Sequence, residues 1–235
     1  MGFFDNELMG RIGAQYADLQ QYLSSDRKFF GRIGILKRTM DISISVVALI
    51  FLLPVFCFVA IAIKLTSDGP VFYRQERLGR FGQLFSIYKF RSMHLDGDNK
   101  LQALLASCPV SKANWDKYQK LKNDPRITRI GAFLRKTSID ELPQIINVLR
   151  GEMSIVGQRP LLPDQQMIYG IDNYLHYIRS RPGITGLWQV SGRNALPFER
   201  RAELDLEYSE KWSIWFDLKI IFMTLPALLF PKGAY

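Results

Sequence analysis

The segment from Ile42 to Ile63 contains no charged residue, and it limits the folds open to this chain more than any other feature. As a continuous α-helix the segment would rise about 33 Å, enough to cross the hydrocarbon core of a bilayer. Pro54 lies near its middle, where a proline removes one helical hydrogen bond and bends or breaks the helix. The sequence therefore predicts a membrane-embedded helix broken by proline.

Basic residues lie at both ends of this segment, with Lys37 and Arg38 before it and Lys64 after it. Positive residues favour the cytoplasmic side of a membrane, so both ends are expected on that side. A re-entrant helix that enters, breaks at Pro54 and returns satisfies this pattern, and a kinked true span is the alternative. Asp41 could pair with Arg38 at the entry. We assign membrane anchoring to Lys37, Arg38, Asp41 and Pro54.

The remainder of the chain predicts an α/β mixed domain, rich in helices and with short strands. We expect a cytoplasmic appendage over residues 1–36, the re-entrant helix over 37–66 and a catalytic domain at the membrane interface over 67–235. Residues 71–73 and 84–90 read as a strand hairpin. The run Leu218–Phe230 contains Lys219 and Pro226 and follows Trp212 and Trp215, which favours an interfacial amphipathic helix with the tryptophans at headgroup depth.

The net charge of +9 and the pI near 9.6 suit an anionic partner such as a nucleic acid, a phospholipid surface or a phosphorylated substrate. The basic residues do not form one stripe interleaved with aromatic residues, so we expect no nucleic acid as a partner. The two cysteines, Cys57 and Cys108, form no disulfide framework, and no zinc-ligand spacing is present.

Asp140 and Glu141 are adjacent carboxylates, followed by apolar residues at helical spacing. We expect them near a helix N-terminus, where the helix dipole would keep them ionised as a nucleophile or a metal ligand. A structural alternative exists, because Ser138-x-x-Glu141 matches a capping box. With Ser138 as N-cap, however, Pro143 would crowd a helical carbonyl, whereas with Asp140 as N-cap it falls in the first turn.

Two further segments could hold phosphate or a nucleotide. Met153–Leu161 reads as a short strand ending in a turn that carries Arg159, and arginine suits bidentate phosphate contacts. Residues 181–194 contain three glycines between polar and basic side chains, which could make a loop that approaches a nucleotide closely. The candidates there are Arg181, Gln189, Arg193 and Asn194.

Several motifs occur in one order along the chain and together resemble the bacterial sugar transferases of the monotopic phosphoglycosyl transferase family. They are Lys37-Arg38-x-x-Asp41, the proline-broken helix, Asp68-Gly69-Pro70, Tyr88-Lys89-Phe90-Arg91, Asp140-Glu141-Leu142-Pro143-Gln144, Gly157-x-Arg159-Pro160 and Arg181-Pro182-Gly183. The chain looks most similar to the compact rhizobial members that initiate exopolysaccharide repeat units. Two positions depart from the family pattern: Leu53 stands where a serine is usual, and Gln158 where a proline is usual.

The resemblance implies an enzyme that transfers a hexose 1-phosphate from UDP-galactose or UDP-glucose to undecaprenyl phosphate and releases UMP. It implies Asp140 as the nucleophile that forms a phosphosugar-aspartate intermediate and Glu141 as the ligand of Mg²⁺. Arg135, Arg159 and Lys89 match substrate phosphate positions, and Asp205 matches a supporting position. The candidates in 181–194 would contact the nucleotide or sugar.

The resemblance implies that the protein is located at the cytoplasmic face of the bacterial inner membrane and contacts its phospholipids. Some members of the family form homo-oligomers, so a homo-oligomer is possible here. The sequence leaves open which hexose is transferred. The rival interpretation is a membrane-anchored, non-catalytic scaffold of a polysaccharide assembly complex, which would be free to vary Asp140, Glu141 and Arg159. The presence of all three residues favours the enzyme.

Overall fold

A computed structural model describes residues 32–118, 121, 124–192 and 198–229. The predicted appendage therefore lies almost entirely outside the described residues. Helices dominate and strands are short, as predicted. The elements are α3 (Arg32–Thr66), β1 (Phe72–Leu78), η1 (Arg80–Gly82), β2 (Leu84–Phe90), α4 (Gly97–Ser107), α5 (Pro109–Tyr118), α6 (Arg129–Thr137), η2 (Ile139–Gln144), α7 (Ile145–Arg150), β3 (Ser154–Val156), η3 (Pro163–Gln165), α8 (Gln166–Tyr169), α9 (Ile171–Tyr177), β4 (Gly183–Thr185), α10 (Leu187–Ser191), α11 (Phe198–Lys211) and α12 (Ile214–Leu229).

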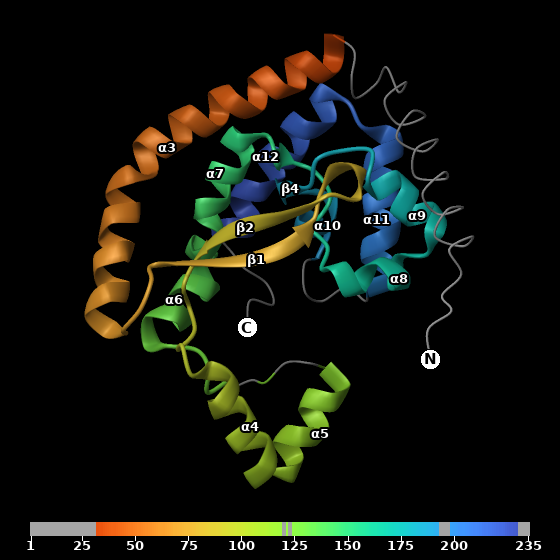
Figure 1. Cartoon of the computed structure of the whole chain (residues 1–235). Helices are drawn as coiled ribbons and strands as arrows, with labels where there is room; N and C mark the ends of the chain where they lie inside the picture. The colour runs from red at the N-terminus through yellow and green to blue at the C-terminus, as the bar shows by residue number, and fades with distance from the viewer. Residues whose placement is uncertain (1–31, 119–120, 122–123, 193–197, 230–235) are drawn as a thin grey trace, which may run out of the picture.

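Among the described residues, α3 is the one helix long and apolar enough to cross a membrane. The helix continues through Pro54 as a single element, so it is not divided into two segments there. Figure 1 shows it curving around the body of the molecule and changing direction near its middle. Proline removes one hydrogen bond while the turns on either side stay intact, so the result is a bend. The outer face carries exposed apolar side chains, including Phe51, Phe58 and Leu65.

The inner face of α3 packs against the globular body. Phe56, Val59 and Ile63 are buried in a cluster with Phe90 of β2 and Leu134 of α6. This alternation of buried and exposed apolar residues explains why the whole segment is hydrophobic: one side contacts protein and the other is available to lipid. The chain therefore has a long helix with an exposed apolar face, a candidate membrane anchor, that is fixed to its globular part.

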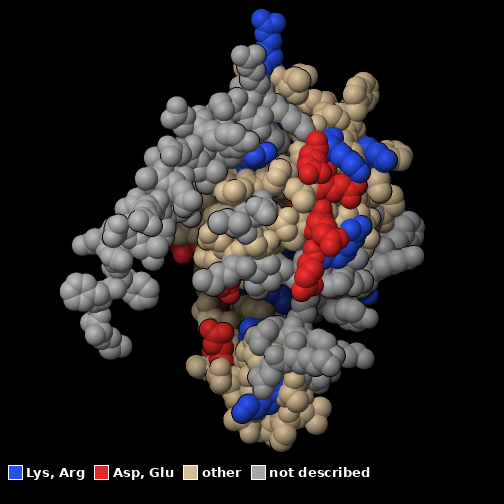
Figure 2. All heavy atoms as spheres, turned by 90° about the vertical axis from the view of Figure 1, so that its right-hand side faces the viewer, with Lys and Arg blue, Asp and Glu red and all other residues tan. Residues whose placement is uncertain are grey.

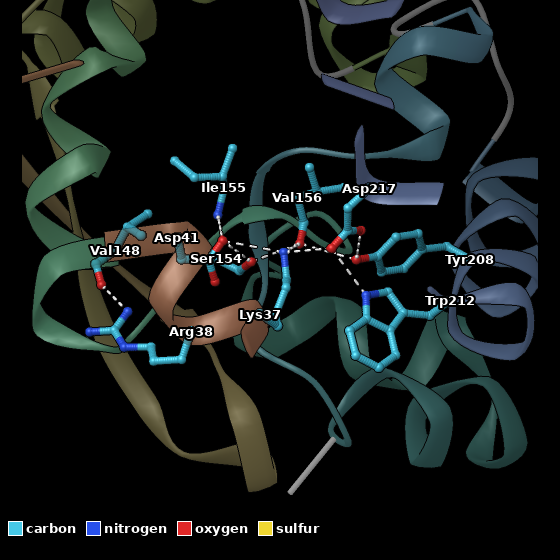
Figure 3. A network of polar contacts seen from close by, with 10 residues as sticks. All are labelled: Lys37, Arg38, Asp41, Val148, Ser154, Ile155, Val156, Tyr208, Trp212 and Asp217. Atoms are coloured by element: carbon cyan, nitrogen blue, oxygen red, sulfur yellow. Dashed lines mark hydrogen bonds and ion pairs between the residues drawn. The ribbon is translucent and has the colours of Figure 1, made fainter. Parts of the chain in front are cut away.

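The start of α3 is held by a buried polar network, drawn in Figure 3. Lys37 Nζ lies 2.8 Å from Asp217 Oδ2 and 3.2 Å from Asp41 Oδ1, and it also donates to the Val156 carbonyl at 3.1 Å. Asp41 Oδ1 accepts further bonds from Ser154 Oγ and the Ile155 amide, each at 3.0 Å. The network joins α3 to β3 and to α12.

The predicted pairing of Asp41 with Arg38 is wrong. Arg38 instead donates to the carbonyl oxygens of Val148 at 2.6 Å and Leu149 at 3.0 Å, at the end of α7. Both carbonyls lie in the last turn of α7, where few helical donors remain, and the guanidinium adds donors there; the Val148 carbonyl also accepts from the Gly151 amide at 2.9 Å. Lys37 and Arg38 thus bind groups of the protein itself, and these contacts fix the start of α3 to the globular body.

The predicted position of Trp212 is also wrong, whereas Trp215 is exposed. Trp212 is buried and its indole N–H donates to Asp217 Oδ2 at 3.1 Å. Trp215, the second residue of α12, is 81% exposed, and Phe222 on the same helix is 74% exposed. α12 therefore has a core-facing side held by Asp217 and an exposed apolar side suited to a membrane interface.

Two small sheets complete the fold. β1 and β2 pair antiparallel, with Tyr73 opposite Lys89 and Arg77 opposite Phe85, which confirms the predicted hairpin. β3 and β4 pair parallel, with Val156 opposite Thr185. Residues 183–191 are therefore a strand and a short helix, and the prediction of a glycine loop there was wrong.

The glycines of this segment allow close backbone packing. A Cβ on Gly183 would lie 2.1 Å from the Gly157 nitrogen and 2.4 Å from the Thr185 oxygen. We therefore expect Gly183→Ala to destabilise the fold by about 1–3 kcal/mol and to lower the melting temperature. The matched control is Gly97→Ala in α4, whose Cβ would meet Arg126 side-chain carbons at 3.3 Å. A melting temperature lowered equally in both variants would contradict this explanation.

On the side of the molecule that carries α11, acidic and basic side chains lie beside one another (Figure 2). Along α11 they form ion pairs, Arg200 with Glu203 at 2.6 Å and Lys211 with Glu207 at 2.8 Å. The net positive charge of the chain does not gather on this helix.

Candidate active site

A sharp turn after α6 places the two adjacent carboxylates. Thr128 caps the start of α6 by accepting a hydrogen bond from the Gly131 amide at 2.9 Å. The helix ends at Ser138, whose φ of +59° is left-handed and redirects the chain into η2. Asp140 and Glu141 lie in the first turn of η2.

Neither predicted capping arrangement is present. The Ser138 side chain makes no capping hydrogen bond, so the capping-box alternative is wrong, and Asp140 lies inside η2 instead of acting as an N-cap. Pro143 is tolerated because the 3₁₀ turn precedes α7, where an α-helical hydrogen bond from its position is not required. Neither carboxylate therefore caps a helix, and both can contact other groups of the site.

Glu141 meets the hairpin. Lys89 Nζ of β2 lies 2.6 Å from Glu141 Oε1. Burial alone would raise the pKa of Glu141, but the positive charges of Lys89, Arg159 and Arg77 outweigh it and lower that pKa to about 2. Glu141 is therefore ionised throughout the physiological range.

Asp140 has the opposite behaviour. Asp140 is only 8% exposed. Burial, and after it the negative charge of Glu141, raises the pKa of Asp140 to about 6, although the positive charges of Lys89 and Arg135 oppose this rise. The carboxyl is still mostly ionised at neutral pH, as the sequence predicted, but burial and not a helix dipole sets its pKa. A poorly solvated carboxylate is a better nucleophile than a hydrated one.

A small pocket lies next to this pair. It is lined by polar or charged side chains from β1, β2, η2 and α10, and by backbone near Gly183; the side chains include Arg77, Lys89, Glu141, Gln144, Arg159 and Gln189. Lys89, Arg159 and Gln189 were expected from the sequence. Arg77 and Gln144 were missed. The signal for Arg77 was its place on the same hairpin face as Lys89.

Arg77 is buried, and burial together with the nearby charge of Arg159 lowers its pKa to about 10. Its guanidinium donates to the Gln75 side chain at 2.7 Å and to the Pro160 carbonyl at 3.3 Å. Two arginines held close together despite their repulsion provide a strongly positive wall, which suits an anion with more than one charge.

Arg159 packs against the ring of Trp188. Its guanidinium carbon lies 4.9 Å from the centre of the Trp188 ring, and that of Arg201 lies 5.3 Å from the same ring. Asp205 is buried nearby and accepts a hydrogen bond from the Tyr169 hydroxyl. Burial raises the pKa of Asp205 to about 7, opposed by that hydrogen bond and by Arg159. Asp205 is thus adjacent to the site, as expected of a supporting residue.

Gln158, which stands at the position of the usual proline, is buried and donates to the Asp205 carbonyl at 3.0 Å. The turn that carries Arg159 is therefore tied to α11 by a side-chain hydrogen bond.

Some predicted residues do not join the carboxylates. Arg181 lies on another part of the molecule, where its Nε donates to the Gly151 carbonyl at 2.6 Å and where it lines a cavity with Lys37 and Asp41. Its assignment to the nucleotide or sugar was wrong, because α7 and the parallel pairing of β4 direct it away. Arg135 donates to Ser92 Oγ at 3.0 Å and acts electrostatically on Asp140. Arg193 and Asn194 lie outside the described residues.

The donor set fits a magnesium ion that also contacts a phosphorylated substrate. The described residues contain no cluster of three or more His, Cys, Asp or Glu side chains that could hold a metal. Mg²⁺ commonly uses one or two carboxylates and completes its coordination with water and substrate phosphates. Glu141, with Asp140 beside it, offers that set.

The comparisons with known proteins agree on one family. The family described as bacterial sugar transferase matches residues 32–231. The undecaprenyl-phosphate galactose phosphotransferase of Salmonella typhimurium is 47% identical over 201 residues, which cover 85% of this chain and 42% of that protein. The exopolysaccharide production protein ExoY of Sinorhizobium fredii is 45% identical over 202 residues, which cover 86% of this chain and 89% of that protein.

A third relative is the UDP-glucose:undecaprenyl-phosphate glucose-1-phosphate transferase of Escherichia coli, 41% identical over 217 residues, which cover 89% of this chain and 44% of that protein. The chain thus spans less than half of the Salmonella and Escherichia proteins and most of the length of ExoY. The match to the family includes α3, the carboxylate pair and the Arg159 turn. The chain belongs to the bacterial sugar transferase family, a family of transferases.

Proposed function

We propose that this chain transfers a hexose 1-phosphate, of galactose or glucose, from a UDP-sugar to undecaprenyl phosphate and releases UMP. The transfer would begin the synthesis of an exopolysaccharide repeat unit. The observation that carries this proposal is the placement of Glu141 against Lys89, Arg77 and Arg159, with the buried Asp140 next to it in the chain, in a member of this family. The named relatives act on the same classes of substrate.

In the first half of the reaction, an Asp140 carboxylate oxygen attacks the phosphorus that carries the sugar. A new O–P bond forms to Asp140, and the bond from that phosphorus to the bridging oxygen breaks. UMP leaves with the electron pair of the broken bond. Arg77, Arg159 and Lys89 balance the negative charge of the diphosphate, and the charge of Arg135 favours the ionised form of Asp140.

In the second half, a phosphate oxygen of undecaprenyl phosphate attacks the same phosphorus. The bond to Asp140 breaks and regenerates its carboxylate, and the sugar is left on a lipid diphosphate. One aspartate thus lets two anionic substrates use one small site in turn. Gln189 lines the pocket and is our candidate for a contact to the nucleotide or sugar.

Glu141 would hold Mg²⁺, with Asp140 adjacent. When bound, the ion would neutralise charge on the substrate phosphates. The Lys89 ammonium already occupies one side of Glu141, so Lys89 would orient this carboxylate as well as contact phosphate.

We propose that α3 re-enters the cytoplasmic face of the bacterial inner membrane and does not cross it. The change of direction near the middle of α3, the presence of Pro54 inside the helix and the exposed apolar faces of α3 and α12 support this arrangement. We expect reporter tags at residues 1 and 235 both to be on the cytoplasmic side in cells. A periplasmic signal from one tag alone would establish a true span.

The rate of the first half-reaction should depend on the ionisation of Asp140. Because the pKa of this carboxyl is about 6, the rate of UMP release in a single turnover without acceptor should be about tenfold lower at pH 5 than at its plateau. Lys89 lowers the pKa of Asp140, so Lys89→Met should move the acidic limb to higher pH. Lys112→Met, on α5, should leave it in place. A flat profile between pH 5 and 8 would contradict the assigned nucleophile.

The function is tested by supplying the purified full chain in detergent with Mg²⁺, undecaprenyl phosphate and a panel of UDP-sugars. Release of UMP with UDP-galactose or UDP-glucose is expected and would identify the donor. Release of UDP would mean ordinary glycosyl transfer and would overturn the proposal. No nucleotide release with any donor would favour the scaffold.

A further inference from the structure

One face of the β1–β2 hairpin is directed at the carboxylate pair. Side chains directly opposite in an antiparallel pair project from the same face. Tyr73 is opposite Lys89, whose ammonium contacts Glu141. Two and four residues further along β1, Gln75 and Arg77 share that face, and their side chains are hydrogen-bonded to each other. Tyr73 therefore belongs to the same surface as the charged groups of the site.

Tyr73 lies at the solvent-exposed end of this surface. Tyr73 is 50% exposed, whereas Arg77 is 8% exposed and Ile87 of β2 is 2% exposed. The mechanism proposed above leaves Tyr73 without a role. A half-exposed aromatic ring beside an ammonium–carboxylate pair offers apolar contact area immediately next to charge.

The same end of the hairpin lies against the membrane-associating helix. Phe72 stacks on Phe90 with ring centres 5.4 Å apart, and Phe90 meets Phe56 of α3 edge to face at 5.3 Å. Figure 1 shows the start of β1 close to the C-terminal end of α3. The outward face of that half of α3 exposes Phe58 and Leu65. Phe72 and Phe90 project from the face of the hairpin opposite to Tyr73, so α3 packs on the back of the strand end that carries Tyr73.

The two ends of the hairpin face differ in chemistry. Arg77 lies four residues from Tyr73, roughly 13 Å along an extended strand. Arg77 and Arg159 form the cationic end, which suits a nucleoside diphosphate, whereas the Lys89–Glu141 pair lies at the Tyr73 end, because Lys89 is directly opposite Tyr73. A lipid phosphate that arrives from the membrane would reach that pair from the side of Tyr73.

We propose that Tyr73 is a positioning residue for the acceptor, against which the first isoprene units of the polyprenyl phosphate pack. The inference rests on the proposed function and assigns the apolar part of one of its two substrates. The phosphate of the acceptor would then lie beside Lys89, and the chain beyond the first units would follow the exposed face of α3. The donor would not touch the ring.

The test compares Tyr73→Ala, Tyr73→Phe and Leu84→Ala in the full-length protein in detergent. Leu84 is 57% exposed and lies at the other end of the hairpin, opposite Leu78, so it controls for the loss of an exposed apolar side chain. Two rates are measured: steady-state transfer as a function of acceptor concentration, and UMP release in a single turnover without acceptor. The acceptors are undecaprenyl phosphate, a prenyl phosphate of two isoprene units, and methyl phosphate.

We expect Tyr73→Ala to raise KM for both prenyl acceptors about tenfold, equivalent to about 1.4 kcal/mol. Its single-turnover UMP release and its KM for the UDP-sugar should stay within about twofold of wild type, and reactivity with methyl phosphate should not change. Tyr73→Phe keeps the ring and should retain wild-type KM values, as should Leu84→Ala.

A raised KM for the UDP-sugar in Tyr73→Ala would overturn the inference by placing the ring against the donor. Unchanged KM for both prenyl acceptors, or an equal loss in Leu84→Ala, would overturn it as well. In all of these results wild-type protein still releases UMP, so the proposed function stands. Failure of wild type to release UMP would overturn the proposed function and this inference together.

Discussion

Asp140→Asn is expected to lose at least ten-thousandfold in turnover and yet to melt at a higher temperature than wild type at pH 8. The loss follows because an amide cannot form the phosphosugar intermediate. The gain in stability follows from the raised pKa. An Asp140 pKa of about 6, compared with the ordinary aspartate value of 3.8, means that the folded protein disfavours the ionised carboxylate. The difference corresponds to roughly 3 kcal/mol.

The sign of this effect depends on pH. The folded protein binds the Asp140 proton more tightly than the unfolded chain does, so ionisation of Asp140 weakens the fold as pH rises from about 4 to above 6. The stability advantage of Asp140→Asn should therefore be largest at pH 8 and should shrink towards pH 4. Asp164→Asn, at an exposed position in η3, is the matched control and should show neither effect. Equal melting temperatures of Asp140→Asn and wild type at pH 8 would contradict the burial argument.

Lys37→Met is expected to destabilise the protein by about 3–5 kcal/mol, because it leaves two buried carboxylates without their shared cation. Asp41 is 1% exposed and Asp217 is 0% exposed, and both lie within 3.2 Å of the Lys37 ammonium. Burial raises the pKa of Asp217, and Lys37 is the largest of the groups that oppose this rise. The loss should therefore be greater at pH 8 than at pH 5. The measurement is thermal unfolding in detergent.

Two variants control for this prediction. Lys64→Met removes the same charge from the exposed end of α3 and should change the melting temperature little. Adding Asp217→Asn to Lys37→Met removes one of the stranded charges, so it should recover part of the lost stability. A Lys37→Met protein as stable as Lys64→Met would show that the network in Figure 3 does not hold α3 to the globular body.

Much of the architecture could be predicted because it depends on local patterns. The apolar run from Ile42, the alternation around Lys89 and the spacing after Asp140 each identify an element from neighbouring residues. The family followed from the order of several motifs, and the match over residues 32–231 confirms it. The carboxylates, Lys89 and Arg159 could be named for the same reason.

The errors arise where a residue's partner is distant in the sequence. Arg38 could not be matched to carbonyls more than a hundred residues away, and the nearby Asp41 was chosen instead. Trp212 resembled a membrane-interface residue until Asp217 placed it in the core. The glycines of 183–186 indicated a loop because the parallel strand that requires them, β3, is not visible in their own segment. Arg77 was missed because its role depends on the hairpin register.

The central claim is that Asp140 carries the phosphosugar between the two substrates, and the most direct test is the intact mass of the protein. Wild-type protein is incubated with Mg²⁺ and the UDP-sugar but no acceptor. The reaction is quenched in acid, and the intact mass of the protein is measured by mass spectrometry. We predict a mass increase of one hexose phosphate, located on Asp140 by peptide mapping, absent in Asp140→Asn and lost on addition of undecaprenyl phosphate. UMP release without any such adduct, or an adduct that persists in Asp140→Asn, would contradict the account.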